Sequence, residues 1–156
     1  MKNKNILKTL VFILIVGCGY TPILVDKSYP FKIQKIEKIG SAKVNSTIFQ
    51  KLNNLKKIED DISNKTIYNI RLNSEIEKKI ISKDSKGDPL IFEIKIITDV
   101  TILQDGKGKI LSQTITNKIS YDNQTDKFEL IKYENNLIAN LSTNIADKII
   151  SILSNI

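Results

Sequence analysis

Three stretches of two-residue alternation occupy the middle of the chain and restrict what it can fold into. Successive side chains of a strand point to opposite faces, so each stretch predicts a strand with one apolar and one polar face. Residues 82–89 and 105–108 separate the stretches and carry the Gly, Pro and Asp typical of tight turns. The pattern predicts an antiparallel meander with one face to be covered. The apolar positions are Tyr68, Ile70, Leu72, Ile76 and Ile80, then Phe92, Ile94, Ile96, Val100 and Ile102, then Leu111, Ile115, Ile119 and Tyr121.

The C-terminal segment is expected to be a helix that covers this sheet. Asp126, with Glu129 three residues later, resembles a capping box at the helix start. Seven large aliphatic side chains on one stripe correspond to roughly 10 kcal/mol of gross hydrophobic free energy at ~1.5 kcal/mol each. We therefore expect core packing, with membrane or partner binding as the alternative use, and we expect Ser142 to face outward. The stripe is Leu130, Glu134, Leu137, Ile138, Leu141, Ile145, Ile149 and Ile152.

The segment before the meander adds one strand and one helix. Residues 31–39 predict a strand, bulged because Ile36 is out of phase. After Gly40, Asn45 or Ser46 is expected to cap a helix whose apolar face carries Ile48, Leu52 and Leu55. The order is then strand, helix, three strands, helix. We predict an α+β fold of two layers, a four-stranded, mostly antiparallel sheet with two helices on one face.

The first residues have the pattern of a secretory signal. A positively charged start precedes an apolar run from Ile6 to Val16, which is shorter than the ~20 residues of a spanning helix. The residues before the only cysteine, Ile15-Val16-Gly17-Cys18, resemble a bacterial lipobox, in which the cysteine is acylated and the preceding bond is cut. We expect a signal peptide at 1–17, the acylated Cys18 and a tether at 18–29, and a single periplasmic domain at 30–156. A retained anchor or a buried thiol is the alternative.

Composition limits the chemistry that this domain offers. Loss of the leader lowers the formal net charge from +7 to about +4, which gives no reason to expect nucleic-acid binding but favours anionic partners such as lipid phosphates. Without histidine, and with Cys18 acylated, no nucleophile–histidine pair or common metal site is available, so we predict neither an enzyme nor a bound metal or cofactor. Residues 59–61, all acidic, read as a solvated loop. Asp84 and Asp88 are the remaining catalytic alternative, a carboxylate pair for glycosidic chemistry.

The predicted topology places basic residues at one end of the sheet. The turn at 82–89 and the connection at 122–127 emerge at the same end, because the two strands that lead into them run the same way. Lys83, Lys86 and Lys127 are the candidate binding residues, three cations suited to phosphate groups. Asp84 and Asp88 oppose this field, and loop-tip lysines that are only solvated are the alternative.

Several short features together resemble the outer-membrane lipopolysaccharide-assembly lipoprotein family (LptE-like). They are the lipobox followed by Gly19-Tyr20-Thr21-Pro22, the stretch Ile81-Ser82-Lys83-Asp84 and the order of strands and helices. The resemblance implies a non-enzymatic, periplasm-facing domain, held at the outer membrane by its lipid. It also implies that the domain plugs a β-barrel translocon (LptD-like), assists its assembly and binds lipopolysaccharide through basic residues at one end of the sheet. A short C-terminus and the absence of tryptophan depart from the family. A lipid-anchored scaffold of another envelope machine is the alternative.

Overall fold

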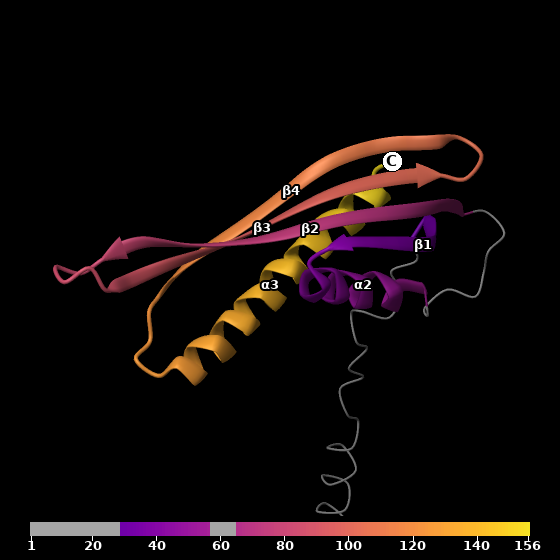
Figure 1. Ribbon diagram of the computed structural model, residues 1–156. Helices are drawn as coiled ribbons and strands as arrows, with labels where there is room; N and C mark the ends of the chain where they lie inside the picture. The colour runs from indigo at the N-terminus through magenta and orange to yellow at the C-terminus, as the bar shows by residue number, and fades with distance from the viewer. Residues whose placement is uncertain (1–28, 57–64) are drawn as a thin grey trace, which may run out of the picture.

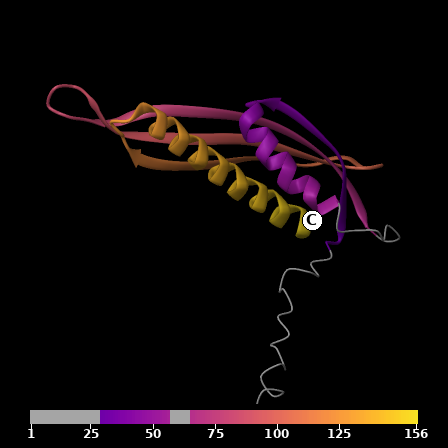
Figure 2. The same ribbon diagram turned by 90° about the horizontal axis from the view of Figure 1, so that it is seen from below.

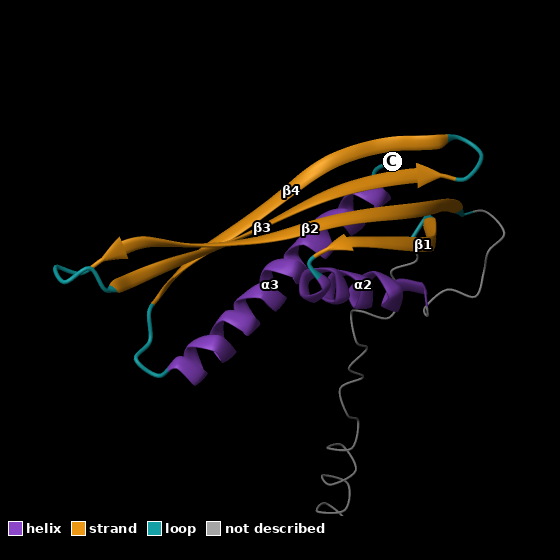
Figure 3. Cartoon of the chain, in the orientation of Figure 1, coloured by secondary structure: helices purple, strands orange, loops and turns teal. Residues whose placement is uncertain are grey.

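The chain folds into one sheet with both helices on one of its faces. The computed structural model describes residues 29–56 and 65–156. The strands lie in the order β1-β2-β3-β4, with β1 parallel to β2 and the other neighbours antiparallel. Figure 1 and Figure 3 show the two layers, which confirm the predicted α+β class and element order. The elements are β1 (Phe31–Gly40), α2 (Ala42–Lys56), β2 (Thr66–Lys83), β3 (Pro89–Gln104), β4 (Gly108–Asp122) and α3 (Lys127–Ser154). The predicted signal peptide, Cys18 and the acidic loop at 59–61 lie outside the described residues.

The core lies between the helix-facing side of the sheet and the two helices. Lys43 contacts Asn135 and Lys51 pairs with Asp147 at 2.6 Å, so α2 and α3 lie side by side and run in the same direction, as Figure 2 shows. Burial of large aliphatic side chains is the main stabilising term of such a layer. The fully buried ones include Ile48, Leu52, Ile70, Leu72, Ile94, Ile96, Ile102, Ile145, Ile149 and Leu153.

The junction between β1 and α2 is fixed by buried polar contacts to β2. Gly40 has a φ of 80°, and a Cβ there would lie 2.3 Å from the carbonyl oxygen of Ser74. That carbonyl accepts from the Ser41 amide at 2.7 Å. The predicted cap at Asn45 or Ser46 is wrong, because α2 already begins at Ala42. Asn45 is instead buried, donating to the Ile39 carbonyl and accepting from the Ser74 hydroxyl. The predicted bulge in β1 is present, between residues 33 and 35.

Helix α3 begins as predicted but buries a wider surface. The carboxylate of Asp126 accepts from the amides of Phe128 and Glu129 at 2.8 and 3.2 Å, which confirms the cap. The last buried side chain of α3 is Leu153, which is 1% exposed, whereas Ile152 of the predicted stripe is only half-buried. The prediction that Ser142 faces outward is wrong: the side chain is 0% exposed and donates to the Ile138 carbonyl at 2.6 Å. The reason is that α3 packs against α2 as well as the sheet, so two sides are covered.

Candidate functional site

The turn between β2 and β3 is held by its own backbone and by one carboxylate. The Gly87 amide donates to the Asp84 carbonyl at 3.1 Å, and Gly87 has a φ of 90°, which glycine adopts without strain. The carboxylate of Asp84 accepts from the amides of Lys86 and Asp88 at 2.9 and 2.8 Å. This carboxylate therefore has a structural role, shaping the turn that carries Lys86.

The connection from β4 to α3 lies beside the base of this hairpin. The Asn123 amide donates to the Leu90 carbonyl at 2.8 Å, and its side chain donates to the Pro89 carbonyl at 2.9 Å. These bonds fix the connection against the start of β3. The prediction that the two loops emerge at one end of the sheet is confirmed.

The three candidate lysines are exposed at this end. Lys83 and Lys86 belong to the β2–β3 hairpin, whereas Lys127 starts α3. Figure 1 and Figure 2 show the hairpin turn projecting beyond the start of α3, so Lys127 lies on a separate projection at the same end. Within residues 29–56 and 65–156, none of the three forms a salt bridge. Their ammonium groups are free to meet an anion.

Apolar side chains are exposed beside these lysines. Ile80, Ile81 and Leu90 on the hairpin are nearly half exposed, and Phe128 and Ile131 on the first turns of α3 are 74% and 58% exposed. The sequence pattern does not predict this feature. It places Ile80 on the covered face of the sheet, and Ile80 does lie on that face, but the helices do not extend over it. The hairpin end therefore presents cations and apolar surface together.

A partly buried cluster of Lys78, Phe92, Tyr121 and Glu134 connects the sheet near the hairpin to α3. The carboxylate of Glu134 accepts from the Tyr121 hydroxyl at 2.7 Å and from the Lys78 ammonium at 2.6 Å. Lys78 also lies 4.4 Å from the ring centre of Phe92, which stacks on Tyr121. Burial, and then the Glu134 carboxylate, raise the pKa of Tyr121 well above its usual value, so the hydroxyl stays a donor. This cluster explains the one polar position in the apolar stripe of α3.

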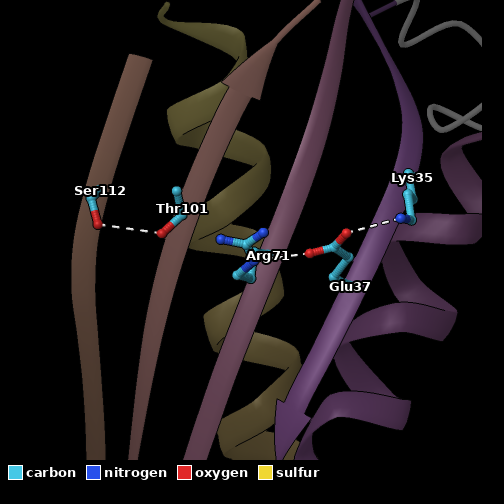
Figure 4. Close-up of polar contacts among 5 residues, drawn as sticks. All are labelled: Lys35, Glu37, Arg71, Thr101 and Ser112. Atoms are coloured by element: carbon cyan, nitrogen blue, oxygen red, sulfur yellow. Dashed lines mark hydrogen bonds and ion pairs between the residues drawn. The ribbon is translucent and has the colours of Figure 1, made fainter. Parts of the chain in front are cut away.

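The uncovered face of the sheet is a polar surface whose side chains pair across strands. Figure 4 shows one row of partners. Arg71 on β2 contacts Glu37 on β1 at 2.9 Å, Lys35 contacts the same carboxylate at 2.9 Å, and Thr101 on β3 lies 3.4 Å from Ser112 on β4. The hydrogen bond from Lys35, and then that from Arg71, lower the pKa of Glu37.

A second charged row crosses the same face nearer the hairpin. Glu93 is 7% exposed and lies between Lys79 at 3.0 Å and Lys118 at 3.5 Å. The hydrogen bond from Lys79 lowers the pKa of Glu93 despite the opposing effect of desolvation. Lys95 and Glu77 pair at 3.0 Å beside it. The face is thus hydrophilic and nearly self-neutralised.

The described residues lack two further features. No group of three or more His, Cys, Asp or Glu side chains in residues 29–56 and 65–156 is arranged to hold a metal ion. Neither α2 nor α3 combines the length and apolar character needed to cross a membrane.

The sequence matches no protein-family model, and no curated protein resembles it closely in sequence. The fold does resemble solved bacterial lipoproteins. Rare lipoprotein B from Shewanella oneidensis aligns with a TM-score of 0.57 and 13% identity, over 78% of this chain and 95% of that one. A minor lipoprotein from Acinetobacter baumannii gives 0.58 and 16%, over 80% and 92%. Lipoprotein B from Nitrosomonas europaea gives 0.57 and 18%, over 81% and 84%. The chain therefore shares the fold of these bacterial lipoproteins.

Proposed function

We propose that this protein is a lipid-anchored lipoprotein of the bacterial outer membrane that helps a β-barrel translocon (LptD-like) assemble and deliver lipopolysaccharide to the cell surface. The observation that carries the proposal is the fold shared with bacterial lipoproteins, in a chain whose only cysteine, Cys18, directly follows a segment with the sequence pattern of a secretory signal. The role is non-enzymatic, and its only covalent group is the lipid on Cys18.

The hairpin end supports lipopolysaccharide as the ligand. Lipopolysaccharide combines phosphate groups with acyl chains, and this end combines Lys83, Lys86 and Lys127 with exposed Ile80 and Leu90. Lysine binds phosphate as a point charge, and apolar side chains favour acyl chains. Each exposed ion contact is worth only ~0 to 1 kcal/mol, so several must act together.

The polar sheet face supports a location inside a water-filled barrel. Most of its charges have partners on neighbouring strands, as with Arg71 and Glu37, so the face needs no apolar cover. The hydroxyl side chains along β4 offer further hydrogen bonds to water or to a barrel wall. A scaffold in another envelope machine would use the same face without binding glycolipid.

Lipopolysaccharide binding is tested by a triple substitution of Lys83, Lys86 and Lys127 to glutamate. All three side chains are exposed, so folding should be retained while affinity for purified lipopolysaccharide falls, more at low salt than at high salt. The matched control is the triple glutamate change of Lys107, Lys109 and Lys148, which alters net charge equally and is likewise exposed. Equal losses for both triples would mean diffuse electrostatics and no site at the hairpin end.

The anchor and the partner need separate measurements. Mass spectrometry of the mature N-terminus should find a diacylglyceryl-modified Cys18; an unmodified cysteine or another start removes the lipoprotein assignment. Crosslinking through polar-face positions such as Thr116 should capture an outer-membrane barrel protein. Capture of a different envelope complex, with no lipopolysaccharide binding, would favour the scaffold instead.

A further inference from the structure

The outer edge of β4 carries a row of unpaired backbone groups. In the described part of the chain, β4 ends the sheet and pairs only with β3. The bond from the Asn123 amide to the Leu90 carbonyl sets the phase of this ladder. Because the direction of the backbone groups alternates along a strand, the odd-numbered residues from 111 onward bond β3 and the even-numbered ones between them point outward. The outward N–H and C=O groups belong to Ser112, Thr114, Thr116, Lys118 and Ser120.

A groove runs along this edge. It has a volume of about 320 Å³ and lies between residues 113–116 of β4 and the side chains of Lys148, Ser151 and Ile152 of α3. Figure 1 shows α3 crossing the sheet diagonally, so that its last turns reach this side. Ile152 is only half-buried and forms an apolar wall, while Lys148 donates to Asn117 on β4 at 2.9 Å. The groove thus flanks a strand edge with one apolar and one cationic side chain.

The edge has a small excess of cations over carboxylates. β4 includes Lys109 and Lys118 and a single carboxylate, Asp122 at its last position. Lys107 and Asp105 share the preceding turn, Lys148 lies across the groove, and Asp99 of β3 accepts from the Thr114 hydroxyl at 2.6 Å. Glu93 of β3 approaches Lys118, but it is shared with Lys79. A second copy of the chain paired along this edge would bring these lysines close to one another, which opposes self-association.

We propose that the outer edge of β4 binds an extended acidic segment of a partner protein as an added strand of the sheet. Main-chain hydrogen bonds to the outward groups of β4 supply the affinity. Alternate side chains of the incoming strand meet Ile152 on the groove side, and the others lie near Lys118 on the polar face. This inference does not depend on the proposed function, because the edge lies away from the hairpin turn and involves no lipid.

The probe is a nine-residue fluorescent peptide in which glutamate and valine alternate, titrated into the full-length protein in detergent micelles and followed by anisotropy. We expect saturable binding that weakens with salt. Two N-methylated versions, each blocking one set of alternate amides, separate pairing from charge. Only one set of amides faces β4 in an added strand, so one version should lose binding and the other should keep it.

The matched protein variants are Thr116→Pro and Thr116→Val. Proline at this exposed edge position removes only an outward amide, and Ile115 before it is already extended, so the β3–β4 ladder should survive. Loss of that hydrogen bond and the added ring should weaken peptide binding about tenfold. Valine keeps the amide and should bind like the native protein. Circular dichroism melts check that both variants fold.

Three results would overturn the proposal. The first is the absence of peptide binding to the native protein. The second is equal binding by Thr116→Pro, or by both N-methylated peptides, which would mean charge attraction without strand pairing. The third is concentration-dependent self-association in sedimentation that Thr116→Pro abolishes, because a second copy would then occupy the edge.

Discussion

The two ends of the sheet share one pattern of alternation but differ in what covers them. Along β2, the helix-facing side chains at 68, 70 and 72 are buried under the helices, whereas Ile76 is half-buried and Ile80 is 43% exposed. The covered end is completed by β1, which pairs with β2 only as far as Ser74. Beyond Ser74, β2 has only β3 as a neighbouring strand, and only the first turns of α3 lie against this part of the sheet.

This difference separates stability from recognition. The covered end holds most of the fully buried aliphatic side chains and the buried contacts of Ser74 with Asn45 and Thr98. The hairpin end holds the exposed lysines and apolar side chains, tied to α3 mainly through Glu134. Changes at the covered end should therefore cost folding free energy, and changes at the hairpin end should alter binding first.

The largest expected effect is in the buried core, midway along α3. Leu141→Ala removes a buried side chain from α3 and should lower the free energy of unfolding by ~2 to 5 kcal/mol. Urea unfolding of purified protein measures it. Ile131→Ala, on the exposed start of the same helix, should stay within ~0.5 kcal/mol and serves as the control. Comparable losses for the two would mean that the ends do not differ as described.

Two glycines with positive φ sharpen the comparison. Gly40 and Gly87 both have positive φ, but an added Cβ would meet backbone 2.3 Å away at Gly40 and nothing within 4 Å at Gly87. Gly87→Ala should cost ~1 to 2 kcal/mol from backbone strain. Gly40→Ala should cost a further ~1 to 3 kcal/mol, because the backbone of β2 must shift. Thermal unfolding of both variants decides whether the close approach at Ser74 matters.

The sequence predicted the elements of this fold because their periods are direct consequences of strand and helix geometry. It failed where a residue's role depends on a distant neighbour. Asn45 looked like a cap, but its partners Ile39 and Ser74 come from two strands. Ser142 looked exposed because one stripe was assumed, whereas α3 has two covered sides.

For the candidate site, the sequence predicted only which loops lie at the same end of the sheet. The alternation fixed which loops share an end, and the exposure of Lys83, Lys86 and Lys127 followed. Periodicity does not tell where the helices stop covering a face, so the exposed Ile80 and Leu90 were missed. The partners of Glu134 were also missed, because Lys78 lies 56 residues away in the sequence.

A smaller effect is expected from the link between the hairpin end and α3. Tyr121→Phe removes the hydroxyl that donates to Glu134, while Lys78 still satisfies the carboxylate. The loss should be ~0.5 to 1.5 kcal/mol in urea unfolding. Glu134→Leu, which leaves both Lys78 and Tyr121 without this partner, should cost more than Tyr121→Phe. The reverse order would mean that the cluster does not hold the hairpin to the helix.

The smallest effect concerns the polar face at low pH. Lys79 lowers the pKa of Glu93 below its ordinary value of 4.5, so in the acid range the folded protein binds fewer protons at this site than the unfolded chain. Stability must then rise with pH there. The contribution of Glu93 is present above about pH 4.5 and is lost as pH falls through the lowered pKa. Glu93→Gln should therefore flatten the decline of stability below that pH.

Glu75→Gln is the matched control for this measurement, since Glu75 is exposed on the same face and forms no salt bridge within the described residues. Its stability profile between neutral and acid pH should follow that of the native protein. The ammonium groups of Lys79 and Lys118 are exposed, so 1 M salt should partly screen their attraction to Glu93 and bring the native and Glu93→Gln profiles closer together. If the native and Glu93→Gln profiles were parallel at every pH and salt concentration, Lys79 and Lys118 would not stabilise the charged form of Glu93. The ion pairs of Glu93 would then contribute nothing to folding stability.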